Sequence, residues 1–143
     1  MYKLILLLFI GTSLYAQRPN HDKIKAFKVA YLTEQLDLTA SEAEKFWPIY
    51  NNFEKNIQEL RQKERQQLFA PIKNQHIENL TNDEANELID KMIMLKTQEL
   101  QYQKELIIEL RNVIAPQKII QLKKAEKEFN KKLLERLKNR RKG

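Results

Sequence analysis

Residues 38–60 read LTASEAEKFWPIYNNFEKNIQEL, and this stretch contains both a helix start and a long helical face. The Thr39 side chain can accept from the backbone of Glu42, while the Glu42 carboxylate can reach back to the backbone of Thr39. Leu38 can pack against Ala43 across this cap. Apolar residues then recur every three or four positions, at Ala43, Phe46, Tyr50, Phe53, Ile57 and Leu60. The spacing predicts an amphipathic helix whose apolar face is a seam for another helix.

The same start signal occurs again at residues 80–85, which read LTNDEA, 42 residues further along the chain. Thr81 and Glu84 repeat the capping pair, and Leu80 and Ala85 repeat the apolar contact across it. Another helix is therefore expected to begin here and to run to about Ile114. Its apolar positions are Ala85, Leu88, Met92, Leu95, Tyr102, Leu106 and Leu110.

Two further helices are expected at the ends of this pair. The first has apolar residues at Ile24, Phe27, Tyr31 and Leu36, and the last begins at Pro116 and has them at Ile119, Leu122, Ala125, Phe129, Leu133 and Leu137. Residues 69–71 (FAP) are expected to end the second helix, residues 73–79 to form a connection, and residues after Asn139 to fray. The sequence thus predicts an all-α fold of four amphipathic helices, arranged as a curved cradle or as helical hairpins.

The composition excludes several classes of protein. The 143 residues include no cysteine and only two glycines, Gly11 and Gly143. Glycine-dependent phosphate loops, dinucleotide fingerprints and nucleophile elbows are therefore excluded. The lack of cysteine excludes disulfides, thiolate metal sites, thiol nucleophiles and acylated lipoprotein anchors. Only two valines occur, which argues against an extensive β-sheet.

Residues 1–16 have the three zones of a secretory signal peptide. Lys3 supplies the positive charge, residues 4–10 are uniformly apolar, and cleavage is expected after Ala16. The alternative is a buried or amphipathic first helix of a cytosolic protein. The apolar run is too short for a transmembrane helix, so no membrane span is expected after cleavage. We therefore expect residues 17–143 to be a single all-helical periplasmic domain with a basic tail from about residue 131, acting without ATP.

No group of residues indicates catalysis. The histidines are His21 and His76, and neither has a second metal ligand at helical spacing. No serine or threonine has an evident histidine and acid partner in the pattern. We therefore expect no enzyme activity, no metal site and no cofactor.

Positive charge is concentrated in the last helix. Residues 17–116 contain 14 basic and 16 acidic residues, whereas residues 117–143 contain 11 basic and 3 acidic ones, a net charge of +8. The candidate partner-binding cations are Lys123, Lys127, Lys131 and Arg136. One interpretation is a solvated helix face, and the other is a landing surface for acidic proteins, unfolded chains or anionic lipid headgroups. Nucleic acid is not an expected partner of an exported chain, although it would become the leading one if export were wrong.

Trp47 also has two interpretations. Tryptophan is enriched at binding hot spots, so Trp47 is a candidate anchor for clients or partners. The alternative is a packing residue beside Pro48, since large aromatic side chains mostly fill cores.

The segments at residues 36–42 (LDLTASE) and 113–118 (VIAPQK) resemble the Spy/CpxP family of small periplasmic helical proteins. That family has two Leu-Thr-x-x-Gln motifs, one at the start of its second helix and one at the start of its fourth. Leu38 and Thr39 match the first motif, and Glu42 stands in place of its glutamine.

The second motif is matched less closely. Ile114 and Ala115 replace its leucine and threonine, Pro116 fits the common proline, and Lys118 replaces the glutamine. The layout nevertheless resembles the family over nearly all of residues 22–138. Residues 44–50 (EKFWPIY) are similar to a sub-branch often labelled as sensors of ECF-type sigma factors or as Spy-like stress proteins.

The resemblance implies a curved, all-helical, often dimeric cradle without a cofactor. Family members either bind unfolded clients without ATP or damp a membrane-bound stress sensor. Our first hypothesis is accordingly a periplasmic holdase whose basic last helix attracts partly unfolded chains. The second is a regulator that docks on a periplasmic sensor domain of a sigma-factor or two-component pathway, and the third is an anchor to anionic lipid. Self-association into a homodimer is also expected, because an open or dimeric assembly buries the apolar faces of long helices better than one thin chain does.

Overall fold

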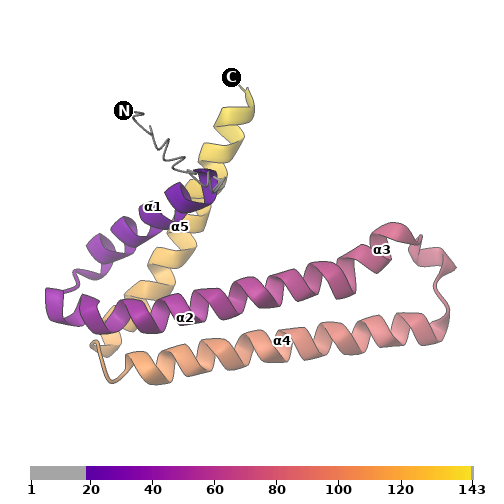
Figure 1. The fold of residues 1–143 in the computed structure, drawn as a ribbon, viewed down its shortest axis with the longest axis horizontal. Helices are drawn as coiled ribbons and strands as arrows, with labels where there is room; N and C mark the ends of the chain where they lie inside the picture. The colour runs from indigo at the N-terminus through magenta and orange to yellow at the C-terminus, as the bar shows by residue number, and fades with distance from the viewer. Residues whose placement is uncertain (1–18, 143) are drawn as a thin grey trace, which may run out of the picture.

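The computed structural model describes residues 19–142, which form helices joined by turns and loops, without strands in that range (Figure 1). The main helices are α1 (Pro19–Leu36), α2 (Ala40–Glu64), α4 (Asn82–Leu110) and α5 (Pro116–Lys142). α2 continues through a π-helical turn, η1 (Arg65–Phe69), and through α3 (Ala70–Asn74), and these segments together make one 35-residue helix. A 3-10 turn, η2 (Ile77–Asn79), precedes α4. The expected all-α fold with four helices is therefore confirmed.

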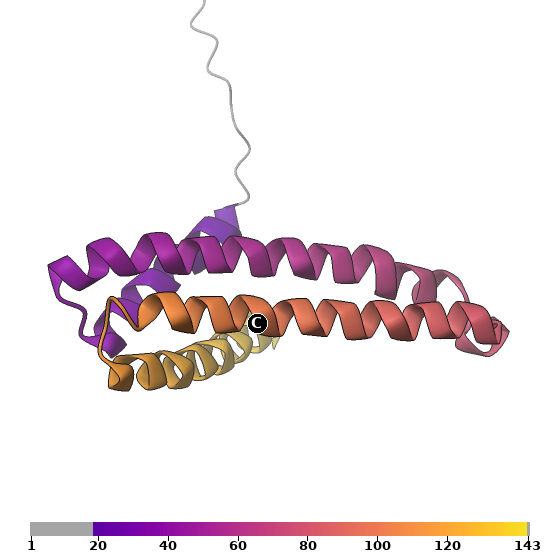
Figure 2. The ribbon, with the colours of Figure 1, turned by 90° about the horizontal axis from the view of Figure 1, so that it is seen from below.

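The four helices form two arms that diverge from one corner. α2 and α4 lie side by side, antiparallel, and make the long arm, whereas α1 and α5 pack together in the second arm (Figures 1 and 2). The loops at residues 37–39 and 111–115 both lie at the corner (Figure 1). The described chain is therefore an open V rather than a closed four-helix bundle.

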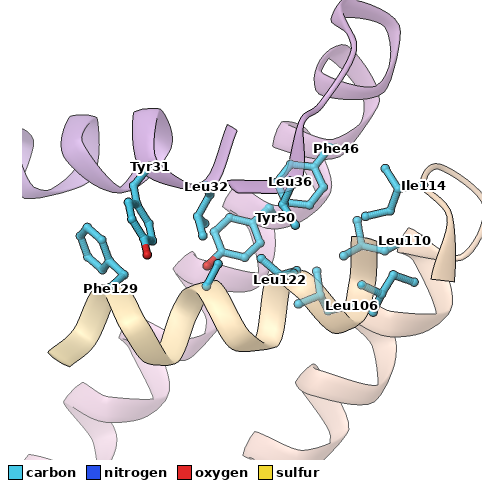
Figure 3. Close-up of a cluster of buried hydrophobic side chains, with 12 residues drawn as sticks. Tyr31, Leu32, Leu36, Phe46, Tyr50, Leu106, Leu110, Ile114, Leu122 and Phe129 are labelled. Atoms are coloured by element: carbon cyan, nitrogen blue, oxygen red, sulfur yellow. The ribbon is translucent and has the colours of Figure 1, made fainter. Parts of the chain in front are cut away.

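The main core lies at the corner, where all four helices contribute side chains (Figure 3). Its buried members are Tyr31, Leu32, Leu36, Phe46, Tyr50, Leu106, Leu110, Ile114, Ile119, Leu122, Ala125 and Phe129. Figure 3 shows that Tyr31 from α1 and Tyr50 from α2 both lie against α5. The outer part of the long arm has a second, smaller seam formed by Ile57, Leu60, Leu68 and Leu95. The arms are thus fixed at the corner, and their outer parts are covered on one side only.

Both predicted helix starts are confirmed. The Thr39 hydroxyl accepts the Glu42 N–H at 3.1 Å, and Glu42 Oε2 accepts the Thr39 N–H at 3.0 Å. At the second start, Thr81 and Glu84 make the same two hydrogen bonds at 3.2 and 2.8 Å. Each pair satisfies N–H groups that helix geometry leaves without an intrahelical acceptor.

The expectation that residues 69–71 end the second helix is wrong. A proline inside a helix lacks an N–H, and its ring collides with the carbonyl four residues earlier. Here the helix widens just before Pro71, where the Ala70 N–H donates to the carbonyl of Arg65, five residues back. This π turn accommodates the proline, and the helix continues to Asn74.

The helix expected to reach about Ile114 ends earlier, at Leu110. Ala115 precedes Pro116, and a residue before proline avoids the helical region of backbone space. Before that restricted residue the chain turns over residues 111–114, where the N–H groups of Val113 and Ile114 both donate to the Leu110 carbonyl at 3.0 Å. The turn brings the Ile114 side chain into the core, where it is 5% exposed.

The ends of the arms also differ from the prediction. Met92 and Leu137, expected on apolar seams, are 46% and 45% exposed. Met92 lies where only two helices pack, and Leu137 lies beyond the last half-buried residue of α5, Leu133. The segment expected to fray after Asn139 is instead helical to Lys142, since straight-chain basic residues are good helix formers.

Candidate functional site

The two segments that resemble family motifs meet at the corner. Leu38, Thr39 and Glu42 stand at the start of α2, and Ile114, Ala115 and Pro116 lead into α5. Leu38 and Ile114 pack in or against the core, Thr39 caps α2, and Ala115 and Pro116 are exposed. The motif residues therefore build the corner of the fold.

Lys118 connects the two segments. Its Nζ donates to the backbone carbonyl of Asp37 at 2.6 Å and to Glu42 Oε2 at 2.7 Å. Hydrogen bonds to an ionised carboxylate favour that form, so the bond from Lys118, followed by the one from the Thr39 N–H, lowers the pKa of Glu42. Asp37 has a φ of 46°, a left-handed conformation that aspartate tolerates better than most residues. Lys118 thus fixes a tight turn and a helix start at once.

A line of charged and hydroxyl groups crosses the junction of α1, α2 and α5. Lys28 pairs with Glu54 at 2.9 Å and lies 5.3 Å from the centroid of the Tyr50 ring. The Tyr50 hydroxyl donates to Glu126 at 2.8 Å, and Glu126 pairs with Lys123 at 3.4 Å. Burial raises the pKa of Tyr50, and the charge of Glu126 adds to this effect, so the hydroxyl keeps its proton and remains a donor. The network joins three helices and is part of the fold.

The four cations expected to bind partners fall into two groups in the structure. Lys123 and Arg136 lie over phenylalanine rings of α2 and α1, 5.8 and 4.2 Å from the ring centroids. Both cations therefore have an aromatic partner within the molecule, and Arg136 is exposed as well. Lys127 and Lys131 are exposed and form no ion pair with any residue of the range 21–141. The candidate landing surface therefore rests on Lys127 and Lys131.

Two cations with defined partners, Lys118 and Lys132, are absent from the predicted set. Lys132 Nζ lies 4.7 Å from the centroid of the Tyr31 ring. A signal for both was available in the spacing. Lys118 is four residues before Leu122 and Lys132 is three residues after Phe129, which places both on the apolar side of the last helix.

Trp47 fits both of its interpretations. It is half-buried and packs edge-on against Phe46 and Tyr50, with ring centroids 5.0 and 5.7 Å apart. The same side chain lines a groove of about 480 Å³ between α1 and α2, next to α5. Trp47 is thus a packing residue with one face toward a groove.

α4 exposes a row of large apolar side chains along the outer part of the long arm. Ile89, Ile93 and Leu100 are 48%, 60% and 66% exposed, and we call them the open face of α4. Leu100 is seven residues from Ile93 and seven from Ile107, so the three share one side of the helix. Ile107 packs against the core at the corner, and the open face therefore leads outward from that core.

Neither a metal centre nor a membrane span is found in the part of the chain that the structure describes. No three of its histidine, aspartate and glutamate side chains are grouped so that they could hold a metal ion. None of its helices combines the length and the apolar character needed to cross a bilayer. Residues 1–16, the expected signal peptide, lie outside the described range.

Comparison with known proteins found no relative. No protein-family model, no curated protein and no solved structure matches the chain. The resemblance to the Spy/CpxP family therefore stays a prediction, and the functional argument rests on the residues above.

Proposed function

We propose that this protein is an ATP-independent periplasmic holdase of the Spy/CpxP type, which binds partly unfolded proteins and is not an enzyme. The observation that supports it best is the open face of α4, where three large apolar side chains are about half to two-thirds exposed. Exposed apolar patches of this kind mark interaction sites in monomeric proteins. In this proposal the two arms form the cradle, and the open face is an apolar wall that holds clients.

The composition around the open face of α4 suits clients that share no common sequence. Met92 lies next to the open face and is 46% exposed. Methionine side chains are flexible and polarizable, and they adapt to partners of varied shape. The open face of α4 can therefore bind apolar segments of clients weakly and without a fixed register.

Charge is proposed to act before the apolar contact. Lys127 and Lys131 project from a helix whose region has a net charge of +8. The electric field of this net positive charge raises the rate at which acidic segments meet the protein, and salt screens the field. Capture should therefore slow as ionic strength rises, while the apolar contact persists.

The test is suppression of aggregation by residues 17–143, without nucleotide, using denatured citrate synthase and malate dehydrogenase as unrelated clients. We expect Ile93→Ser/Leu100→Ser to require about tenfold more protein for the same suppression, the equivalent of about 1.4 kcal/mol. The matched control is Met94→Ser/Ile108→Ser, which removes two side chains 56% and 52% exposed on a different side of the same helix. Equal loss in both variants would contradict a role for the open face.

The electrostatic step has its own variant. Lys127→Glu/Lys131→Glu should lose suppression of aggregation, mainly at low salt. The control Lys63→Glu/Lys73→Glu changes two exposed lysines outside α5 by the same charge and should retain suppression. Circular dichroism checks that helicity is retained in both. If the two pairs respond alike, net charge rather than the surface of α5 explains the effect.

A dedicated regulator is the second candidate, favoured by Trp47. A half-buried tryptophan beside a groove is a typical anchor for one specific partner. In that case one saturable partner, such as a periplasmic sensor domain, should be recovered from envelope extract, and suppression of unrelated clients should be weak. Suppression of both test clients favours the holdase.

A further inference from the structure

We propose that the groove between α1 and α2 binds a single-chain aliphatic carboxylate, such as a free fatty acid. The groove measures about 480 Å³, in the lower half of the range of about 300–1,000 Å³ typical of small-molecule sites. Along α2 its lining extends from Trp47 to Arg61, which is about 21 Å at 1.5 Å per residue. These dimensions suit one elongated chain rather than a compact or two-chain ligand.

On α2 the lining changes from aromatic to basic with distance from the corner, from Trp47 and Tyr50 to Lys55 and Arg61. α1 runs toward the short loop at residues 37–39 and α2 runs away from it, so Val29 and Trp47 lie nearer the corner than His21 and Arg61. Ile24 from α1 and Phe129 and Leu133 from α5 add apolar lining along the groove. An aliphatic chain would therefore extend toward the corner, with its head group at the open end.

Charge selects the head group. The groove is lined by Lys25, Lys28, Lys55 and Arg61 and by the single acid Glu54. Lys28 and Glu54 are paired at 2.9 Å, which leaves three cations that make no ion pair among the described residues. Lysine and arginine form charge-assisted hydrogen bonds with a carboxylate, and they disfavour a cationic head. The complementary ligand is therefore anionic at one end and apolar along the rest.

The chain has a built-in probe for this ligand. Trp47 is the sole tryptophan, and it lines the apolar part of the groove. We would titrate the protein with dodecanoate below its micelle concentration and follow Trp47 emission together with the heat of binding. Saturable one-to-one binding with a shift in emission is expected. Dodecyltrimethylammonium, with the same tail and the opposite charge, and hexanoate, with the same head and a short tail, should both bind much more weakly.

Variants separate this site from nonspecific amphiphile binding. Lys55→Gln/Arg61→Gln should weaken dodecanoate binding about tenfold, whereas Lys127→Gln/Lys131→Gln removes two cations outside the groove and should leave it unchanged. Val29→Phe, which fills the end of the groove nearer the corner, should also weaken dodecanoate binding. If that variant folds poorly, Lys55→Gln/Arg61→Gln remains an independent test, because Lys55 and Arg61 are exposed.

The inference would be overturned by a lack of saturable binding, by equal binding of the cationic amphiphile, or by an unchanged affinity in Lys55→Gln/Arg61→Gln. A Trp47 response to an acidic apolar peptide without any response to dodecanoate would likewise overturn it and assign the groove to a protein partner. The outcome is independent of the holdase proposal, because the open face of α4 contributes no residue to this groove.

Discussion

The Glu42 carboxylate and the Lys118 ammonium form a 2.7 Å ion pair across 76 residues of sequence, at the corner where α2 and α5 begin. By the resemblance to the Spy/CpxP family, both residues stand where a motif has glutamine. Taken singly, each is a departure from the motif. Within this structure the two charges compensate each other, because a partly buried charge of either sign would be costly without the other. The ion pair therefore links the starts of α2 and α5 beside the apolar core of the corner.

This pair should make stability depend on acid. The hydrogen bond from Lys118 is the main cause that lowers the pKa of Glu42. A carboxyl group with a lowered pKa contributes stability that is fully present above its ordinary value of 4.5 and is lost as the pH falls through the lower value of the folded protein. Lys118→Met should therefore lower the midpoint of thermal unfolding at neutral pH, and its difference from the wild type should shrink below about pH 4.5. Circular dichroism melts across this range measure both.

Lys127→Met is the control for that series. It removes the same charge from the same helix, but Lys127 is exposed and makes no ion pair with the described residues. Its midpoint should stay close to that of the wild type at every pH. A parallel acid response in the two variants would show that net charge, and not the Glu42 pair, governs the effect.

The two tyrosines against α5 should differ in what their hydroxyl groups contribute. The Tyr50 hydroxyl donates to Glu126 at 2.8 Å, whereas the Tyr31 hydroxyl donates to Glu128 at the longer distance of 3.3 Å. A buried hydrogen bond to a charged group contributes about 1.5–3 kcal/mol. We expect Tyr50→Phe to lower the free energy of unfolding by about 2 kcal/mol and Tyr31→Phe by less than about 1 kcal/mol. Urea unfolding of the two variants measures this, and similar losses would disprove the ranking.

Local chemistry made the helix starts predictable. Thr39 and Thr81 each meet all their capping partners within three residues, so the sequence alone contains the complete arrangement. The apolar spacing of the second helix likewise placed Phe46 and Tyr50 in the core, where they are 0% and 1% exposed. The π turn before Pro71 was not predictable, because a proline is compatible both with a helix end and with a local widening.

The candidate site was harder to predict, because its contacts join distant parts of the chain. Tyr50 and Glu126 are 76 residues apart, and only the meeting of α2 and α5 at the corner brings them together. Lys123 and Arg136 could be recognised as cations of the last helix, but their placement over aromatic rings depends on how α1, α2 and α5 cross. Composition identified the basic helix, and packing decided which of its cations meet an aromatic ring within the molecule.

The corner and the outer long arm should differ in their response to loss of core volume. Leu122 is fully buried among all four helices, whereas Leu95 is 5% exposed in a seam formed by two helices. The cost of a Leu→Ala change depends on how far the surroundings can collapse into the cavity. We expect about 4 kcal/mol for Leu122→Ala and about 2 kcal/mol for Leu95→Ala.

Hydrogen exchange locates the two effects. Leu95→Ala should increase exchange in the outer parts of α2 and α4 and leave the corner protected, whereas Leu122→Ala should increase exchange in all four helices. Equal costs, with global loss of protection in both variants, would mean that the long arm unfolds together with the corner.

Export is the prediction on which the choice of partner depends. Cleavage before Gln17 is predicted from Lys3, the apolar residues 4–10 and Ala16. Expressed in a bacterium with its own leader, the protein should be recovered from the periplasmic fraction with the intact mass of residues 17–143. Ala16→Arg should block cleavage, because the cleavage site requires a small residue there. Ala26→Arg, an exposed change within α1, serves as the control and should leave cleavage unchanged.

Recovery of the uncleaved wild-type chain in the cytoplasm would contradict export. In that case nucleic acid would become the first partner to test, because the net charge of +8 over residues 117–143 would then face phosphate backbones rather than periplasmic clients.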